Sequence, residues 1–337
     1  MRRALPLLLL VAACSSGTTS SPARSAAPSP SVHGGGRVRA STAARSTPGT
    51  VASVRWSAGA RLPRAVSEVG VAVLGTQVHV LGGYVDGHPH STTHLVLDTA
   101  SGHWRTAAPL PQALDHVGAV GLDGKVWAVG GFGAVAGGTT GLWSWDPGTD
   151  RWQAHAALPS ARAAGVCVVL AGKLHYVGGK SHGVDVAEHD VYDPASDRWT
   201  TAAPMPTARD HAAGAVVDGR LYVTAGRPHD LSVTESYDPA TDRWTSLAPV
   251  PLGRSSLAGA AFRGRFVVIG GEHPGEAGVD TEVDAFDPRT ARWSRLPDLP
   301  AGRQGIGAAV VGGVLYLPGG GPTGGGSRQS DTLLVLS

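Results

Sequence analysis

Asparagine is absent from this chain of 337 residues, and only three of its 28 basic residues are lysines. A chain without asparagine has no N-glycosylation acceptor. Basic and acidic residues nearly cancel at a formal net charge of +2, and no basic run follows the first few residues. The electrostatic surface of a nucleic-acid-binding protein is therefore not expected. Glycine and proline, with 48 and 24 residues, leave little room for long helices.

Cysteine is almost as scarce, and the two cysteines, Cys14 and Cys167, are not expected to pair. Cys167 stands in the apolar run 165–169, which is typical of an inner strand. There a free thiol behaves as a small hydrophobic side chain. A domain of this size buries enough surface to fold without a disulfide.

The first 13 residues have the pattern of a lipoprotein signal peptide, with a basic start and an apolar run too short to span a bilayer. Residues 11–14 resemble the bacterial lipobox. This resemblance implies that Cys14 is lipidated and that the exported protein is anchored to the bacterial cell membrane, with its domain outside the cytoplasm. The alternative is an ordinary signal peptide with an incidental cysteine. Residues 14–50, rich in Ser, Thr, Ala, Pro and Gly, are expected to form a disordered tether.

Two features recur with the same period along residues 51–337. The first is a tryptophan every 45 to 49 residues: Trp56, Trp104, Trp152, Trp199, Trp244 and Trp293. The second is a pair of glycines, in which an alanine replaces one glycine of the fourth pair: 82–83, 130–131, 178–179, 225–226, 270–271 and 319–320. A four-stranded propeller blade has a period of about 40 to 50 residues. The sequence therefore predicts an all-β domain, a six-bladed β-propeller, over 51–337.

Each unit also shows the expected order of strands. In residues 206–244, a strand of small side chains at 212–217 is followed by an Asp-Gly hairpin turn and by a second strand. Small residues suit the innermost strand, because blades converge on the axis, whereas a tryptophan fits the wider outer edge. The last unit contains only three strands. We therefore expect residues 54–56 to supply the fourth strand and to close the ring without an exposed edge.

These elements resemble the kelch repeat. The resemblance rests on the glycine pairs, the spaced tryptophans and a Tyr-Asp-Pro cluster, which occurs with two variants: 145–147, 192–194, 237–239 and 286–288. The chain departs from the pattern at Ala225 and at 97–99, where we expect local accommodation. The resemblance implies a kelch β-propeller closed by its N-terminal strand in the last blade. The chain is similar to kelch-type sialic acid mutarotases and to galactose-oxidase-like propellers.

Kelch proteins that bind ligands commonly use two positions per blade on one face. The first position follows the glycine pair: Tyr84, Phe132, Lys180, Arg227, Glu272 and Gly321. The second is the polar stretch before each inner strand: Arg64, Asp115, His116, Arg162, Arg209, His211, Arg254, Ser256 and Arg303. Five arginines of the second set would form an electropositive mouth for acidic ligands, and the two aromatic residues could stack on a sugar or peptide. The alternative is that many of these arginines bond the carbonyls of neighbouring blades.

Other candidate chemistry is weak. His88, His90 and His94 are metal-ligand types in one loop, but the sequence shows no second shell for them, and we expect neither a metal nor a cofactor. No Ser/His/Asp or Cys/His arrangement stands out. A copper radical oxidase of the galactose-oxidase type would need a crosslinked Cys–Tyr pair, and the position of Cys167 on an inner strand gives it no support.

The sequence therefore favours a surface-displayed, non-catalytic binding module for a glycan or protein ligand at the channel mouth, with no nucleic-acid partner. The alternative is a carbohydrate-active enzyme of the sialic acid mutarotase type, an epimerase that needs a general acid and a general base. Glu272 with Arg227 or His211 is the grouping that we nominate for that chemistry. A purely structural envelope protein is the third possibility.

Overall fold

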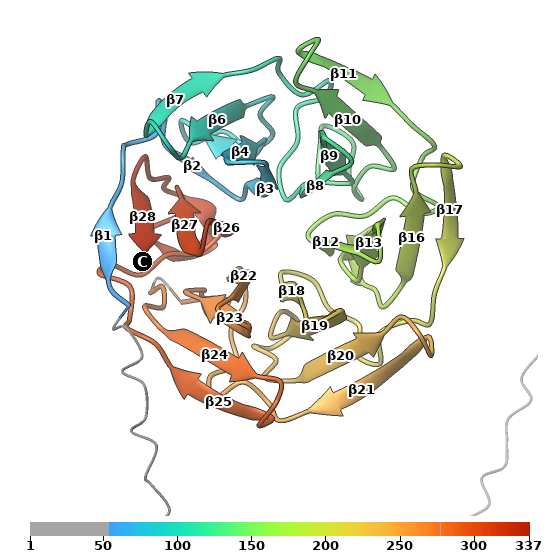
Figure 1. The fold of residues 1–337 in the computed structure, drawn as a ribbon, viewed down its shortest axis with the longest axis vertical. Helices are drawn as coiled ribbons and strands as arrows, with labels where there is room; N and C mark the ends of the chain where they lie inside the picture. Colours follow the sequence, from blue (N-terminus) through green and yellow to red (C-terminus); the bar gives the residue numbers. More distant parts are fainter. Residues whose placement is uncertain (1–53, 277) are drawn as a thin grey trace, which may run out of the picture. The chain divides into compact units, whose positions relative to one another are not determined.

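The computed structural model describes residues 54–276 and 278–337, which form a β-propeller of six blades around a central axis (Figure 1). The all-β class and the number of blades are as predicted. The predicted signal peptide (1–13), the lipidated Cys14 and the tether (14–50) lie outside the described residues. Within the described part, no helix has the length and hydropathy needed to cross a membrane.

The first three blades are sheets of four antiparallel strands. Blade 1 contains β3 (Gly70–Leu74), β4 (Gln77–Leu81), β6 (His94–Asp98) and β7 (His103–Thr106). Blade 2 contains β8 (Gly118–Leu122), β9 (Lys125–Val129), β10 (Leu142–Asp146) and β11 (Arg151–Ala154). Blade 3 contains β12 (Val166–Leu170), β13 (Lys173–Val177), β16 (His189–Asp193) and β17 (Arg198–Thr201).

The other three blades repeat this order. Blade 4 contains β18 (Ala213–Val217), β19 (Arg220–Thr224), β20 (Thr234–Asp238) and β21 (Arg243–Leu247). Blade 5 contains β22 (Ala258–Phe262), β23 (Arg265–Ile269), β24 (Val283–Asp287) and β25 (Arg292–Arg295). Blade 6 contains β26 (Ala309–Val311), β27 (Val314–Pro318), β28 (Leu333–Leu336) and β1 (Trp56–Ala58). One short extra element, β2 (Val66–Ser67), precedes the inner strand of blade 1. The others follow second strands: β5 (Tyr84–Val85), β14 (Lys180–Ser181), β15 (Val184–Asp185) and η1 (Gly324–Gly326).

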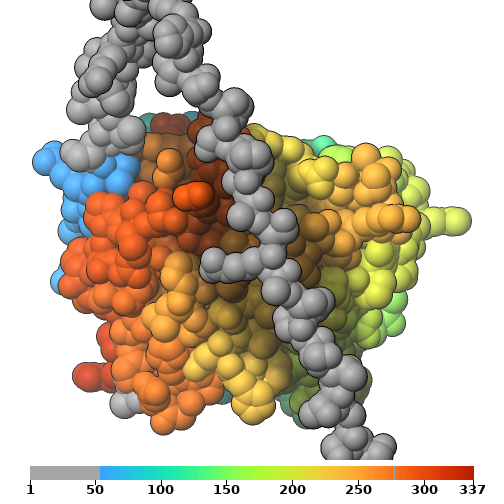
Figure 2. Space-filling model, turned by 90° about the horizontal axis from the view of Figure 1, so that it is seen from below, coloured from blue at the N-terminus to red at the C-terminus, as the bar shows by residue number. Residues whose placement is uncertain are grey.

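The N-terminal strand closes the ring, as predicted. β1 pairs with β28 in the register Trp56↔Leu336, Ser57↔Val335 and Ala58↔Leu334. Figure 2 shows the propeller edge-on, with this strand (blue) beside the C-terminal part of the chain (orange to red). The closing strand thus lies slightly later in the sequence than the predicted 54–56. Because the last blade takes strands from both ends of the domain, neither end leaves an unpaired long edge.

The inner strands are as narrow as their sequences require. Gly121 in β8 is one example, because a Cβ at this position would lie 1.8 Å from the carbonyl oxygen of Val73 in blade 1. The predicted hairpin turn in blade 4 has positive φ at both residues, 48° at Asp218 and 75° at Gly219. Ala225, the residue in place of a glycine, keeps the left-handed backbone of its counterparts with φ 64°. The repeat therefore imposes its backbone even where the residue type departs from it.

Six hydrophobic clusters make up the core, and each lies between two adjacent blades. Each repeated tryptophan packs at the outer edge of one cluster, and its indole N–H donates to a carbonyl of the segment that leads into its own blade. Trp152, for example, donates to the Ala108 oxygen at 2.9 Å. Trp56 of the closing strand makes the equivalent bond to Pro297, at 2.8 Å. The tryptophan therefore fills the wide outer space, as predicted, and also anchors the incoming chain.

The Asp-Arg-Trp triplets connect neighbouring blades, as predicted. Asp197 in blade 3 accepts a hydrogen bond from the Tyr192 hydroxyl at 2.7 Å and another from the Ala156 amide, in the segment arriving from blade 2, at 2.9 Å. Asp150 and Asp242 make the same two kinds of contact. These carboxylates are therefore scaffolding and not part of a site.

Candidate functional site at the channel mouth

Six residues, one from each blade, form a ring around the axis just before the inner strands. We call it the axial ring: Glu68, His116, Ala164, His211, Ser256 and Gly305. Each of these residues donates its backbone N–H to the carbonyl of the preceding member at 2.7 to 3.1 Å, and Glu68 completes the circle by donating to Gly305. All six have left-handed backbone, with φ between 50° and 58°. The main chain therefore closes the ring by itself and leaves the side chains free to differ.

A second set of side chains surrounds the axial ring. These are the residues that follow the glycine pairs, which we call the outer ring: Tyr84, Phe132, Lys180, Arg227, Glu272 and Gly321. Each pairs through antiparallel backbone bonds with the residue just before an axial-ring member, as Phe132 does with Asp115 and Arg227 with Asp210. The structure thus brings the predicted first set together at one face of the propeller, around the opening of the channel.

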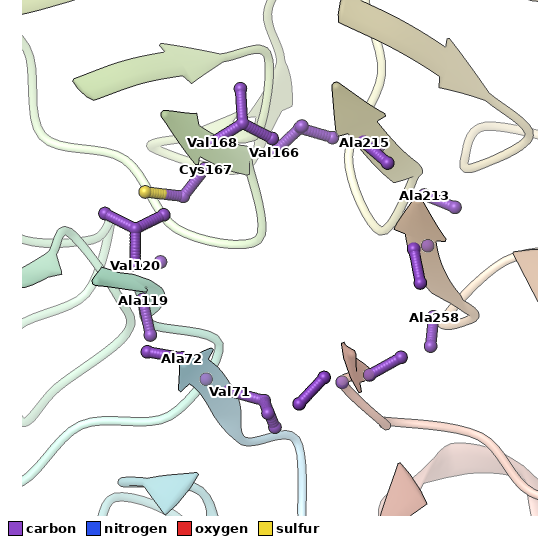
Figure 3. A pocket seen from close by; sticks show the side chains of 18 of the residues that line it. Val71, Ala72, Ala119, Val120, Val166, Cys167, Val168, Ala213, Ala215 and Ala258 are labelled. Carbon is purple, nitrogen blue, oxygen red and sulfur yellow. The ribbon is translucent and has the colours of Figure 1, made fainter. Parts of the chain in front are cut away.

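The channel itself has an apolar wall and a polar mouth. Small side chains of the inner strands enclose about 530 Å³ along the axis, and Cys167 lies on this wall (Figure 3). At the mouth, the axial ring lines a smaller cavity of about 110 Å³. Beside it, a pocket of about 730 Å³ extends over blades 1 to 3. Its wall combines the rings of Tyr84 and Phe132 with the polar groups of His90, Asp115 and Lys180.

His116 is held between two carboxylates. Its Nε2 lies 2.9 Å from a Glu68 oxygen and its Nδ1 lies 2.5 Å from Asp115, whose second oxygen is 2.6 Å from His90 Nδ1. Burial opposes the charged form of His116, but the two carboxylates outweigh it and raise its pKa to about 10. Burial likewise opposes ionisation of Glu68, yet His116 brings the pKa of this carboxyl below its usual value. The ring therefore contains a buried imidazolium, next to Tyr84 and Phe132.

His211 has the opposite character. Its Nδ1 lies 3.1 Å from Asp210, and its ring centroid is 4.7 Å from that of His116. Burial, together with the nearby positive charge of His116, lowers the pKa of His211 despite Asp210. The Asp210 carboxylate is also 3.1 Å from Lys180 Nζ, and although burial works against its ionisation, His211 and Lys180 lower its pKa. His211 is therefore a neutral imidazole whose Nε2 can accept a proton or bind a cation.

Glu272 and Arg227, nominated from the sequence, form a pair on the outer ring. Arg227 donates to Glu272 at 2.6 Å, and the Ser256 hydroxyl donates to the same oxygen at 2.9 Å. The second Glu272 oxygen accepts from the Gly325 amide at 2.6 Å. Glu272 is nearly buried, whereas 28% of the Arg227 side chain is exposed. Glu272 and Arg227 therefore form the nominated pair. The nominated pairing of Glu272 with His211 is not formed, because the carboxylate beside His211 belongs to Asp210.

The expected ring of five arginines at the mouth is not what the structure contains. The side chains of Arg162, Arg209 and Arg254 have no exposed surface. Each forms an ion pair with a carboxylate on the third strand of its own blade: Asp190, Glu235 and Asp284, respectively. Arg303 is nearly buried and donates to the Gly319 carbonyl at 2.8 Å, and Arg64 is exposed.

The prediction of an electropositive mouth is therefore wrong. The mouth has mixed charge, because Lys180 and Arg227 each face carboxylates. The alternative prediction was that many of these arginines bond the carbonyls of neighbouring blades. The buried arginines do bond carbonyls, but these carbonyls belong to the arginine's own blade. Arg209, for example, donates to Val233 in blade 4 at 2.8 Å. A buried guanidinium needs both a counter-charge and acceptors for its N–H groups, and the inside of each blade supplies them.

The histidines of the loop at 88–94 do not converge. His88 is exposed, and His90 pairs with Asp115 at the mouth. His94 is buried in blade 1, where it bonds His79 at 2.9 Å. Among the described residues, the group with metal-binding geometry is instead Glu68, His116 and His211, whose ligand atoms all lie within 4.8 Å of one another.

Sequence reasoning missed Glu68 and Asp210 as members of the site. A signal for both was present, because Asp115-His116 and Asp210-His211 are the same dipeptide at the same place in the repeat. Alignment on the glycine pairs puts Glu68 in register with the two histidines. The alignment could not reveal that three positions from blades 1, 2 and 4 meet across the axis.

These features define a β-propeller with a closed main-chain ring and a polar, mixed-charge mouth. The chain belongs to the kelch-repeat family. The KLHDC2/KLHL20/DRC7 Kelch-repeats domain matches residues 50–226, and the Kelch motif matches residues 208–251 and 253–300. Among solved structures, that of YjhT is similar, with a TM-score of 0.72 and 18% identity over 82% of this chain and 96% of that chain. At this identity the likeness shows the fold alone. No curated protein sequence matches the chain.

Proposed function

We propose that this propeller is a binding module for a glycan, which occupies the pocket of about 730 Å³ beside the axial ring. The observation that carries the proposal is the composition of this pocket. The Tyr84 and Phe132 rings share its wall with Lys180, His90 and Asp115. Sugars present apolar faces edged with hydroxyl groups, so they match aromatic surfaces next to hydrogen-bonding groups.

The polar groups of the pocket offer both donors and acceptors. Burial and the nearby Asp115 carboxylate raise the pKa of Tyr84 to about 12, so its hydroxyl remains a donor at neutral pH. Lys180 faces Asp185 and Asp210 at 3.1 Å, with 27% of its side chain exposed. A carboxylate or sulfate on the ligand would therefore have to share this ammonium with two acids. The proposal of an acidic ligand now depends on Lys180 and Arg227 rather than on the buried arginines.

A glycan-array screen followed by calorimetry tests the proposal. With the bound glycan, Tyr84→Ala and Phe132→Ala should each weaken binding at least tenfold, or about 1.4 kcal/mol. Arg151 is exposed on β11, the outer strand of blade 2, and does not line the pocket. The control variant Arg151→Ala should therefore bind the glycan normally. Capture of a protein partner with no glycan binding, or glycan binding that ignores both aromatic changes, would contradict the proposal.

The charge of the ligand is tested by salt. If the glycan is acidic and engages Lys180 or Arg227, its affinity should fall as ionic strength rises, because salt screens partly exposed charges. Lys180→Ala should remove part of this dependence, because Lys180 is the cation that lines the pocket, whereas Arg151→Ala should leave it unchanged. A salt-independent affinity would restrict the proposal to neutral glycans.

A second candidate is a carbohydrate-active enzyme of the sialic acid mutarotase type. The observation that favours it is a pair of groups with opposite protonation at the mouth, the neutral His211 and the cationic His116. Mutarotation needs a base for the anomeric hydroxyl and an acid for the ring oxygen. Proton NMR of sialic acid anomers should then show faster exchange with the wild type and a loss of this effect in His211→Ala, which removes the base. Equal rates with and without protein would remove this candidate.

The place of action is also part of the proposal. The lipobox-like segment and tether predicted for residues 1–50 would display the propeller outside the cytoplasm on a lipid anchor. Metabolic labelling with a radioactive fatty acid should mark the wild type and not Cys14→Ser. Labelling of neither protein, together with export, would point to the ordinary signal peptide.

A further inference from the structure

The axial ring contains three side chains that can ligate a metal. Glu68, His116 and His211 come from blades 1, 2 and 4, and their ligand atoms lie within 4.8 Å of one another. All three are largely buried, with 7%, 10% and 8% of their side chains exposed. Bringing such groups together away from water is costly unless they are paired or bind an ion. The positions are also fixed, because the closed main-chain ring holds each residue.

The two histidines share a feature of metal-binding imidazoles. In each, Nδ1 faces the carboxylate of the preceding residue, Asp115 at 2.5 Å and Asp210 at 3.1 Å. A carboxylate on one nitrogen orients the ring and leaves the other nitrogen as the ligand. The Nε2 of His116 already points to the Glu68 oxygen, 2.9 Å away. The same dipeptide thus places a carboxylate beside Nδ1 twice, in blades 2 and 4.

The remaining members of the ring leave room for an ion. Ala164, Ser256 and Gly305 are small, and the cavity lined by the ring has a volume of about 110 Å³. Gly305 makes space for the acid, because a Cβ at this position would lie 2.5 Å from the Glu68 carboxyl carbon. A cavity of this size holds a metal ion and one or more small ligands, such as water.

We infer that Glu68, His116 and His211 bind a divalent transition-metal ion, with coordination positions left open toward the channel. The ion takes the place of the proton on His116 Nε2, which faces Glu68 in the metal-free protein and is released to solvent on binding. Two imidazoles and one carboxylate form a ligand set used for Zn²⁺ and for Fe²⁺ in open sites. Asp115 and Asp210 face the Nδ1 atoms of the two imidazoles and orient the rings. This inference does not depend on the proposed glycan, because the pocket and the metal cavity share no lining residue.

The test uses the purified chain without an affinity tag, stripped by a chelator and then titrated with Zn²⁺ or Co²⁺. We expect one ion per chain and ligand-field absorption from bound Co²⁺. Asp210→Asn should lower the affinity about 10- to 100-fold, and His211→Ala and Glu68→Gln should lower it further. His229→Ala, in an exposed loop, should leave the affinity unchanged.

X-ray absorption of the Zn²⁺-loaded wild type gives an independent result that needs no variant. Two imidazole ligands and at least one oxygen are expected. The inference is overturned if the wild type binds no ion, if the bound ion has no imidazole ligand, or if folded His211→Ala binds as tightly as the wild type. Circular dichroism establishes the folding of each variant, and if His211→Ala does not fold, the absorption spectrum decides.

Discussion

Arg209 and Glu235 form an ion pair inside blade 4, and replacing the arginine alone should destabilise the propeller strongly. Neither side chain is more than 1% exposed. The guanidinium also donates to the carbonyls of Val233 at 2.8 Å and Ala225 at 3.2 Å. Arg209→Met keeps most of the side-chain volume but leaves a buried carboxylate and two carbonyls without this donor. Breaking such a pair costs about 3–5 kcal/mol.

The predicted loss is large enough to measure in two ways. The free energy of unfolding from urea titration at pH 7.5 should fall by about 3–5 kcal/mol. For a domain of this size, each kcal/mol lowers Tm by about 2–4 °C. The double variant Arg209→Met/Glu235→Leu should recover most of the loss, because no uncompensated charge remains. Arg243→Met, on the exposed outer strand of the same blade, should change stability by less than about 0.5 kcal/mol.

Two results would refute this reasoning. If Arg209→Met unfolds like the wild type but loses ligand binding, the guanidinium acts at the mouth, and the original expectation of a ligand-binding arginine is right. If the double variant is as unstable as the single one, the loss comes from packing and not from a stranded charge. Ligand affinity should instead survive Arg209→Met at temperatures where the variant is folded.

Three further predictions concern the frame of the propeller. Ala225→Gly should raise the free energy of unfolding by about 1 kcal/mol, because it relieves a left-handed alanine. Gly226→Ala should lower the free energy of unfolding, because the new Cβ would lie 2.5 Å from the Asp210 carbonyl oxygen. Urea titration of both variants tests this, and changes of the opposite signs would contradict it. Trp56→Phe removes the indole donor to Pro297 and should cost about 1–3 kcal/mol in a thermal melt, and an unchanged Tm would show that the closing strand does not need it. Acid should also destabilise the fold, because burial holds four imidazoles neutral and lowers each pKa from the usual 6.5 to about 3 or 4: His79, His94, His175 and His189. Between pH 6.5 and these lowered pKa values, each histidine is protonated in the unfolded chain but neutral in the folded protein. From about pH 6 down to pH 4.5, each should therefore lower the free energy of unfolding by about 1.4 kcal/mol per pH unit. A free energy of unfolding from urea titration that stays constant over this range would be inconsistent with buried neutral imidazoles.

The fold was predictable because each repeated residue has one physical task. The tryptophans, the glycine pairs and the Asp-Gly turn recur where an outer gap, a left-handed turn and a hairpin require them. The missing fourth strand of the last unit predicted closure by β1, and the pairing Trp56↔Leu336 bears this out. The first and last residues of each strand were less predictable, because strand ends depend on backbone hydrogen bonds that the sequence does not specify. The inner strand β26, for example, begins at Ala309 and not at Gly307.

The arginines could have been assigned correctly from a pattern within the sequence. In blades 3 to 5, an acid on the third strand accompanies each buried arginine: Arg162, Arg209 and Arg254. In blades 1 and 2, the equivalent of the arginine is Val66 or Leu114. The third strand of these two blades has the apolar Leu95 or Trp143 in place of the acid. Charge and counter-charge thus vary together over blades 1 to 5, whereas in blade 6 Arg303 stands with the apolar Leu334 and donates to the Gly319 carbonyl. An arginine that is matched by an acid in its own blade indicates a buried ion pair and not a ligand-binding residue at the mouth.

The site was less predictable, because it joins blades that are distant in the sequence and no local pattern sets the distance between them. The repeat nevertheless separates structure from function. Main-chain bonds close the axial ring, so closure requires no particular side chain there, as Ala164 and Gly305 demonstrate. If the ring served closure alone, small residues at all six positions would avoid the cost of desolvating charged and polar side chains. Glu68, His116 and His211 bear that cost in three of the six blades, and the geometry that they share is the strongest reason to look for a ligand on the axis.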